Sequence, residues 1–546
     1  MADDPPKPAP DTPLKADDAA FGELGSTEAA DRGAELRARE QSELLAPWLP
    51  ISSRAAITGL VLAACVAIPY AHPWLMKART LTPGVSLFGL SEDTQQPTMP
   101  DAVDKVGEAS LPGPTDDQQS RGDELEAEPA NPNGPIAKIQ TELPIPKAII
   151  EGKPTELVSH PEVLDHFFEK LLAVEQKRPG AEARILYYGD SIVASDFITG
   201  KLRRLYQSRF GDAGHGYAIA ANAFPGWFHI DVSRKSSAGW KTSRCIGPYA
   251  EDGIYGLGCV SFTARQPDEW FSMGTADREE WGRSVSRFEL EYLEQPGGGS
   301  VDLILDGNVT DTLSTEGPSV AVKYKTVTAP DGPHKLEVRT KSDAPVRLFG
   351  MRMERDVPGV TLSALGITGA RARFLDKEDD AHWAEVLKAA KPDLVILAFG
   401  TNEVGDGRMA FDEHGQLSKD PMGDYERNLE AVMKQVNAAC PDVSTMLVGP
   451  PDMASNNEAE GHAKPMVGIL IGHQKAVQEK LGWAYFDQFR AMGGAGSMWS
   501  WVQSGMGNTD MIHPTGSGGN ALGKMQWLAV MQAYEEFKEK KRNEGK

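Results

Sequence analysis

Residues 183–191 read ARILYYGDS, a short apolar run that ends in Gly189-Asp190-Ser191. Such a run is typical of a buried strand that enters a tight turn. The following stretch, DFITGKLRRLYQSRFG (196–211), has apolar residues at helical intervals and ends in a glycine, which predicts a helix that stops there. The two stretches together predict a strand–turn–helix unit.

Similar units recur in the second half of the chain. Helical patterns and short apolar runs alternate there: helices are predicted at 382–391, 425–440 and about 464–480, and strands at 393–400, 444–451 and 483–489. Strands that alternate with helices favour a parallel sheet that is covered by helices on both faces.

Between about 236 and 355 the pattern changes to short runs of alternating polar and apolar residues. These runs lie at 286–295, 300–308, 320–329, 334–342 and 346–355, and Asp-Gly pairs at 306–307 and 331–332 supply turns. The pattern predicts an all-β sandwich inserted into the α/β domain. Binding of a polymeric ligand and a purely structural role both remain open for this insert.

The N-terminal part of the chain has a different composition. Residues 1–50 are rich in Pro, Ala, Asp and Glu and are predicted to be disordered. Residues 55–75, AAITGLVLAACVAIPYAHPWL, carry no Asp, Glu, Lys or Arg over the length that crosses a bilayer. They predict a transmembrane helix within 51–76, with a buried core helix as the alternative, and 77–145 reads as a flexible linker. The α/β domain is then expected at 146–235 and 356–546, with the β sandwich at 236–355 between its two parts.

Composition and charge exclude several classes of protein. The chain has 546 residues, of which 40% are apolar and 25% charged, so a wholly disordered or fibrous protein is excluded. Lys plus Arg is 56 and Asp plus Glu is 78, which gives a formal net charge of −22 and disfavours binding to nucleic acid. Four cysteines exclude a disulfide-dense scaffold, and no Cys/His cluster has the spacing of a zinc site. Cys245 and Cys259 are close enough in sequence to pair, but free thiols fit equally well.

Three segments that follow strands carry groups useful for acyl transfer. Open α/β sheets place functional groups at the carboxyl ends of their strands. Ser191 follows the first strand, GTNE (400–403) follows another, and DMIH (510–513) lies in a late loop. A serine nucleophile needs a base, which a histidine can supply, and a carboxylate that orients the histidine. Ser191, His513 and Asp510 meet these three needs.

The same chemistry needs fixed donors for the developing oxyanion. The backbone amides of Ser191 and Gly369, from the glycine-containing segment LGITGARA (365–372), and the side-chain amide of Asn402 are the candidates. Taken singly, each residue also has a plain structural interpretation. Ser191 and Asn402 could each cap a helix, and His513 could be an ordinary loop residue. Glu403 could either adjust the electrostatics of the site or form an ion pair on the surface.

Aromatic residues and histidines outside these blocks have weaker signals. Tryptophans are more often found in the core than in a sugar-binding groove, and the two histidines at 215 and 229 are predicted to be structural. The tryptophans considered for a groove are Trp227, Trp240, Trp499 and Trp501.

The blocks occur in the order of a known superfamily. GDS at 189–191, the glycine block at 366–369, GTNE at 400–403 and DMIH at 510–513 resemble the SGNH/GDSL hydrolases over about 146–235 and 356–540. The resemblance implies a flavodoxin-like three-layer α/β/α fold and ester hydrolysis. It also implies Ser191 as nucleophile, His513 as base with Asp510 as its partner, and Gly369 and Asn402 as oxyanion donors.

The sequence around the first block resembles the sequences of bacterial enzymes that deacetylate cell-wall polysaccharides, including peptidoglycan O-acetylesterases. These enzymes carry a β insert at the same point. That subgroup commonly has a histidine directly after the serine, whereas this chain has Ile192. The resemblance implies no metal or organic cofactor, and an acetylated glycan or peptidoglycan as substrate. With the predicted membrane helix, it implies a single-pass protein of the bacterial inner membrane whose catalytic domain faces the periplasm. An O-acetyltransferase with the same triad and a non-catalytic glycan-binding protein remain as alternatives.

Overall fold

A computed structural model describes most of the chain after residue 161. The described residues are 80–82, 85–86, 157, 162–224, 227–276, 280–373, 378–405, 422–454 and 464–544. β1 (Thr80–Thr82) and β2 (Val85–Ser86) form an antiparallel pair in a unit of their own, and all other described elements belong to one unit within 101–546. The predicted membrane segment 55–75 and the predicted disordered region 1–50 lie outside the described residues. No helix among the described residues is both long and apolar enough to cross a membrane.

A five-stranded parallel sheet forms the centre of the α/β domain. Its strands lie in the order β15-β3-β16-β17-β18, which is 2-1-3-4-5 when they are numbered along the chain. This is the flavodoxin-like order, so the predicted α/β fold is confirmed. The strands are β3 (Glu182–Gly189), β15 (Gly359–Gly366), β16 (Leu394–Ala398), β17 (Ser444–Val448) and β18 (Ala484–Phe486).

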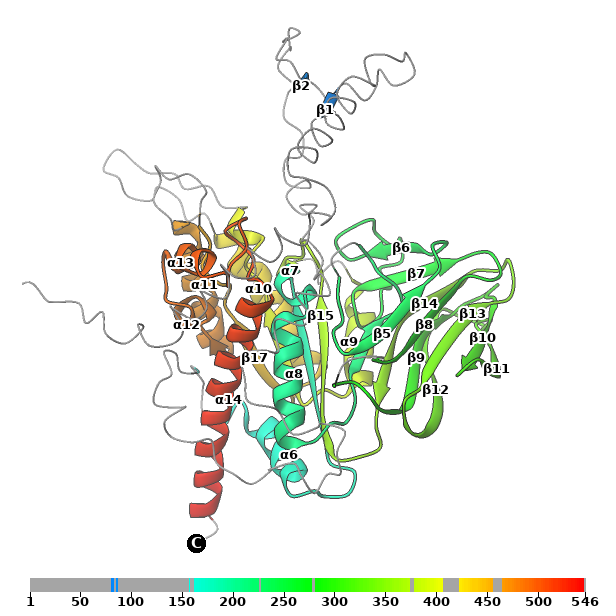
Figure 1. Cartoon of the computed structure of the whole chain (residues 1–546), viewed down its shortest axis with the longest axis horizontal. Helices are drawn as coiled ribbons and strands as arrows, with labels where there is room; N and C mark the ends of the chain where they lie inside the picture. Colours follow the sequence, from blue (N-terminus) through cyan, green and yellow to red (C-terminus); the bar gives the residue numbers. More distant parts are fainter. Residues whose placement is uncertain are drawn as a thin grey trace, which may run out of the picture. The chain divides into compact units, whose positions relative to one another are not determined.

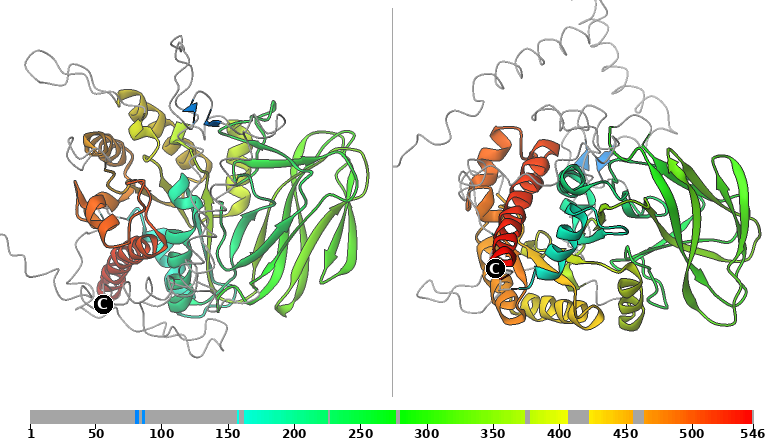
Figure 2. Two further views of the ribbon diagram at one scale, coloured as in Figure 1. Left: turned by 45° about the horizontal axis from the view of Figure 1, so that its top comes forward. Right: turned by 90° about the horizontal axis from the view of Figure 1, so that it is seen from below.

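Helices cover both faces of this sheet (Figure 1). One face carries α6 (Asp165–Glu175), α8 (Phe197–Phe210) and α14 (Gly516–Glu544), and the other carries α9 (Asp380–Ala390), α10 (Gly423–Ala439) and α11 (Pro465–Leu481) (Figure 2, right). Side chains alternate along β3, so that Ile185 and Tyr187 pack with the first set, and Leu186 and Tyr188 with the second. The short elements are α7 (Ser191–Ala194), η4 (Glu403–Gly405), α12 (Gln488–Ala491) and α13 (Ser497–Gln503).

The region between β3 and β15 folds into two antiparallel sheets. One has the order β11-β10-β13-β8-β5 and the other β12-β9-β14-β7-β6, with β4 paired to β14. Because β4 and β5 begin before residue 236, the sheets of the insert start earlier than the sequence-based boundary. The strands are β4 (Gly216–Ile219), β5 (Val232–Ser236), β6 (Lys241–Arg244), β7 (Val260–Ala264), β8 (Trp270–Thr275), β9 (Val285–Glu294), β10 (Ser300–Leu305), β11 (Asn308–Ser314), β12 (Ala321–Gly332), β13 (Lys335–Thr340) and β14 (Val346–Glu354).

The insert packs on the α9 side of the domain and encloses the cysteine pair. The hydroxyl of Tyr188 donates to the carbonyl oxygen of Leu257 at 3.0 Å, which ties β3 to the insert. Cys245 and Cys259 lie next to each other as buried free thiols, and the Cys245 N–H donates to the Cys259 carbonyl at 3.1 Å.

The histidines and tryptophans set aside above lie mostly in the interior. His215 and His229 are buried, with their ring centroids 5.7 Å apart. Burial is the main reason that the pKa of each ring lies well below its usual range, and the charges of nearby arginines lower both pKa values further. The rings of Trp227, Trp240 and Trp501 are buried too, so they have little surface to offer a sugar, whereas Trp499 is half-buried.

Candidate active site

Three neighbouring strands end together and bring three of the predicted segments to one edge of the sheet. Gly189 at the end of β3 pairs in register with Gly366 of β15 and Ala398 of β16. The Ile367 N–H continues the ladder by donating to the Gly189 carbonyl at 3.0 Å. Ser191, Gly369 and Asn402 therefore emerge from adjacent loops at the carboxyl edge of the sheet.

Glycines make this close approach possible. A Cβ atom at position 366 would overlap with the backbone nitrogen of Ala194, which belongs to the helix of the nucleophile. A Cβ atom at 189 would lie 2.7 Å from the carbonyl oxygen of Ala398 and would also collide with Val193. At both positions the added Cβ atom would meet a backbone atom, and a backbone atom cannot rotate away as the end of a flexible side chain would.

Gly366→Ala is accordingly expected to destabilise the α/β domain by about 2–3 kcal/mol, because the added methyl group must displace α7. Gly468→Ala is the matched control, since this residue lies in α11 and has no atom within 4 Å of the added Cβ. There, alanine should stabilise the helix by about 0.5–1 kcal/mol. Thermal unfolding followed by circular dichroism compares the two, and equal midpoints would contradict the expectation.

The turn after β3 is fixed by Asp190 rather than by Ser191. Asp190 is the N-cap of α7, and its Oδ1 accepts a hydrogen bond from the Ile192 N–H at 3.0 Å. Ser191 is the first residue of the helix and is 3% exposed. The structural interpretation of Ser191 as a helix cap is therefore wrong, because Asp190 takes that position and leaves the serine hydroxyl for another partner.

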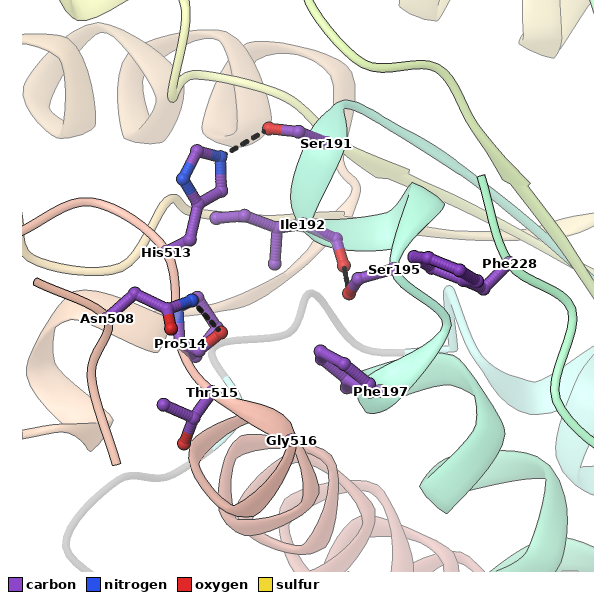
Figure 3. A pocket seen from close by; sticks show the side chains of 10 residues that line it. All are labelled: Ser191, Ile192, Ser195, Phe197, Phe228, Asn508, His513, Pro514, Thr515 and Gly516. Atoms are coloured by element: carbon purple, nitrogen blue, oxygen red, sulfur yellow. Dashed lines mark hydrogen bonds between the residues drawn. The ribbon is translucent and has the colours of Figure 1, made fainter. Parts of the chain in front are cut away.

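That partner is His513. The hydroxyl oxygen of Ser191 lies 2.8 Å from Nε2 of His513, although 322 residues separate them (Figure 3). On the far side of the ring, Nδ1 lies 2.7 Å from Oδ2 of Asp510. The three side chains thus form one hydrogen-bonded chain from hydroxyl to imidazole to carboxylate, the arrangement in which a histidine can accept a proton from a serine.

The loop that carries Asp510 and His513 is held in a bent conformation. Oδ1 of Asp510 accepts the backbone N–H groups of Ile512 at 2.9 Å and of His513 at 3.0 Å. Between them Met511 has a φ of +61°, in the left-handed region that non-glycine residues seldom adopt. The Asn508 N–H closes the loop by donating to the His513 carbonyl at 2.8 Å.

The electrostatics of the loop favour an ionised Asp510. Burial alone would raise the pKa of its carboxyl group, but hydrogen bonding to the His513 side chain, the charge of that ring and the backbone N–H groups lower the pKa below its usual value. The carboxylate is therefore available to stabilise a positively charged imidazole at neutral pH.

The proposed oxyanion donors lie in two loops that contact each other. Gly369 has a φ of +83°, which favours glycine at this position of the loop after β15. The side-chain amide of Asn402 donates to the Ala370 carbonyl at 2.9 Å. An asparagine amide carries two N–H groups, so this bond fixes the direction of the second one. The arrangement suits a site that holds negative charge on a substrate oxygen.

A small hollow that is open to solvent lies beside Ser191 and His513. Figure 3 shows the rings of Phe197 and Phe228 on one side of it, and Asn508 and Thr515 on the other. Ile192 also lines it, so an aliphatic side chain stands where the resembling subgroup commonly has a histidine. Sequence reasoning did not single out Phe197, Phe228, Asn508 or Thr515 as site residues, because neither phenylalanine differs in pattern from a core residue.

The described part of the chain holds no group of three or more His, Cys, Asp and Glu side chains that could bind a metal ion. What the site does bring together is an alcohol, an imidazole, a carboxylate and amide donors. These groups suit nucleophilic attack by serine on an acyl carbon.

Comparison with known proteins finds a family match for part of the chain. Residues 328–521 match the GDSL-like lipase/acylhydrolase family. Among solved structures, the chain is similar to one described as "Peptidoglycan O-acetylesterase in action", with 23% identity, 70% of this chain and 99% of that chain covered, and a TM-score of 0.57. It also matches a family two carbohydrate esterase from Cellvibrio japonicus, with 13% identity, coverage of 56% and 99%, and a TM-score of 0.23. No curated protein sequence matches the chain.

The fold, the site and the family match over 328–521 together indicate a hydrolase with a flavodoxin-like α/β/α fold. Residues 328–521 match the GDSL-like lipase/acylhydrolases, and with the site described above this match indicates a serine hydrolase of the SGNH/GDSL type that resembles peptidoglycan O-acetylesterases.

Proposed function

We propose that this protein is an esterase that removes O-acetyl groups from a cell-envelope glycan such as peptidoglycan. The observation that carries the proposal is the hydrogen-bonded chain from Ser191 through His513 to Asp510. The likeness to a structure described as a peptidoglycan O-acetylesterase supports the choice of acyl group and polymer. That likeness covers 70% of this chain, which is more than the α/β domain alone contains, and therefore extends to the region of the insert.

The reaction follows from the geometry. The hydroxyl oxygen of Ser191 attacks the acetyl carbonyl carbon while its proton moves to Nε2 of His513. Negative charge on the former carbonyl oxygen is stabilised by the amides of Ser191, Gly369 and Asn402. The bond to the sugar oxygen then breaks, and His513 returns the proton to that oxygen.

The second half of the reaction releases acetate. A water molecule gives a proton to His513 and attacks the acetyl group on Ser191, and the serine oxygen leaves with the proton from the imidazole. Asp510 stabilises the charged imidazole in both halves. No step requires a metal or an organic cofactor.

The hollow beside His513 suits the alcohol portion of the ester. His513 must reach the leaving oxygen in order to protonate it, so the sugar lies on the histidine side of Ser191. The hollow borders both residues and includes none of the residues from the oxyanion loops. Its aromatic walls, Phe197 and Phe228, offer apolar faces to the C–H groups of a pyranose ring.

Acetate release from O-acetylated peptidoglycan tests the proposal. The full chain, kept in detergent, should release acetate from the native polymer and none from polymer that was deacetylated with base beforehand. Newly acetylated glycan in place of free acetate would favour the O-acetyltransferase alternative. Binding of the polymer without turnover would favour the glycan-binding alternative.

We also propose that residues 55–75 anchor the protein in the bacterial inner membrane and that the catalytic domain faces the periplasm. The support is the apolar, uncharged composition of this segment, long enough to cross a bilayer. The full chain should sediment with membranes and be released by detergent. A variant that lacks 55–75 and still sediments with membranes would contradict the anchor.

A further inference from the structure

The two loops that carry the oxyanion donors are joined by three hydrogen bonds. The first is the bond from the Asn402 amide to Ala370 described above. In the second, the Arg371 guanidinium donates to the Asn402 carbonyl at 3.2 Å. In the third, the Ala372 N–H donates to Oε1 of Glu403 at 2.9 Å. Glu403 therefore helps to fix the loop that contains Gly369 against the loop that contains Asn402.

Glu403 is buried in surroundings that do not favour a charge. It is 4% exposed, and its second carboxyl oxygen, Oε2, has no hydrogen-bond partner among the described residues. A buried carboxylate with an unpaired oxygen is costly, whereas the protonated group loses much less on burial. Burial first, and then the negative charge of Asp190, raise the pKa of Glu403 to about 8, although the Ala372 N–H and Arg371 oppose this shift.

The other elements around Glu403 supply neutral groups. From α10, the Tyr425 hydroxyl faces this region, and burial raises the pKa of that hydroxyl well above its usual range. From α11, Gln474 donates to the Phe399 carbonyl and to the Tyr425 hydroxyl, each at 2.8 Å. Asp190 and Arg371 are thus the charged groups that determine the state of Glu403.

Asp190 is the better site for the single negative charge. Its two oxygens accept the backbone N–H groups of Ile192 at 3.0 Å and of Thr401 at 3.3 Å. Burial raises the pKa of Asp190 as well, but these bonds and the nearby His513 oppose the shift. Two buried carboxyl groups that interact do not both ionise readily, so the proton is held by Glu403.

We propose that Glu403 is a positioning residue of the oxyanion site that works in its neutral form and that loss of its proton to solvent turns the esterase off. The proposal rests on the function proposed above and gives that site an alkaline limit. An ionised Glu403 would place a negative charge behind the amide donors, where it opposes the charge that develops on the substrate oxygen. It would also repel Asp190 and weaken the contact between the two loops.

Glu403→Gln separates the charge from the packing. Glutamine has the same shape, and its carbonyl oxygen can still accept the Ala372 N–H, but it does not ionise. For the full chain acting on p-nitrophenyl acetate, kcat corrected for spontaneous hydrolysis should fall about 10-fold between pH 7 and pH 9, because one proton is lost near pH 8. In Glu403→Gln the ratio of kcat at pH 9 to kcat at pH 7 should stay within about twofold of 1.

Glu426→Gln is the matched control. Glu426 lies on α10, where it is bound to His473 on the surface of the domain, and this variant should keep the wild-type alkaline decline. The same decline in Glu403→Gln as in wild type would overturn the proposal. If Glu403→Gln does not fold, the wild-type profile remains decisive, because a flat kcat from pH 7 to pH 9.5 also overturns it.

The outcome is distinguishable from failure of the proposed function. A Ser191→Ala variant that retains turnover would remove the serine esterase function and the inference together. An inactive Ser191→Ala variant, combined with no effect of Glu403→Gln on the alkaline limb, would remove the inference alone.

Discussion

Ser191→Ala is expected to lower kcat for p-nitrophenyl acetate by about 10⁴- to 10⁶-fold, the range typical for loss of a serine nucleophile. The hydroxyl oxygen is the atom 2.8 Å from Nε2 of His513, and alanine leaves nothing there to form the acyl-enzyme. The hydrolysis that remains in this variant should be accelerated only by substrate binding and by stabilisation of the oxyanion. Release of p-nitrophenol by the full chain, corrected for spontaneous hydrolysis, measures the loss.

Ser195→Ala provides the matched control for this variant. Ser195 is also a buried serine that lines the same hollow, but its hydroxyl donates to the Ile192 carbonyl at 2.7 Å and faces no base. Its removal should change kcat by less than about threefold. The double variant Ser191→Ala/His513→Ala should be no slower than Ser191→Ala, since the two residues act as one unit. Equal losses in the two serine variants would contradict the role of Ser191.

The central sheet was predictable because its strands have a strong local signal. β3, β16 and β17 are continuous apolar runs followed by turns, and each adjoins a helix with a clear period. The order of the strands has no such local signal. β15 follows the whole insert along the chain, yet it pairs with β3 through eight residues in register. Only the order of the motif blocks, and not their periodicity, connected LGITGARA to the edge where Ser191 lies.

The start of the insert could not be predicted for a related reason. β4 has four residues, GYAI, and all four are buried, so the polar–apolar alternation that identified the later strands is missing. Its pairing partner is β14, more than a hundred residues away, where Gly350 lies opposite Ile219. A strand this short is defined by its tertiary pairing and not by its own sequence.

The roles of Asp190 and Glu403 also depend on contacts between distant segments. Thr401 bonds to Asp190 across 211 residues, and Ala372 bonds to Glu403 across 31. Sequence alone allowed Glu403 to be a surface residue, because glutamate is seldom fully buried. The sequence therefore identifies which residue types reach the site, whereas the fold decides which oxygen accepts which N–H, and hence where a charge is tolerated.

Asp510→Asn is expected to lower kcat by about 10³- to 10⁴-fold while the loop keeps its shape. The amide oxygen of asparagine can still accept the N–H groups of Ile512 and His513, as Oδ1 does now. Its NH₂ group would then face Nδ1 of His513, which must become an acceptor, so Nε2 would carry the hydrogen and could no longer accept the proton of Ser191. Steady-state kinetics with p-nitrophenyl acetate measures the loss.

The pH dependence of stability gives this variant a second readout. The pKa of Asp510 is lower in the folded protein than its usual value, so its ionised form stabilises the fold at pH values above the unfolded pKa, and this contribution is lost as the pH falls through the folded pKa. Asp510→Asn should therefore have a smaller loss of thermal stability between pH 7 and pH 3 than the wild type. The effect is small, because the side chain is 42% exposed and water screens its charge.

Asp306→Asn in the insert is the control that separates a catalytic Asp–His pair from a structural one. Asp306 repeats the local geometry, with Oδ2 lying 2.7 Å from Nδ1 of His334 and Oδ1 accepting the Lys335 N–H at 2.9 Å, but no serine faces the other nitrogen of that ring. Nε2 of His334 lies instead 2.7 Å from the Pro330 carbonyl oxygen. Asp306→Asn should leave kcat within about twofold of the wild type. A comparable loss in both variants would mean that Asp510 acts through the stability of the fold and not through the tautomer of His513.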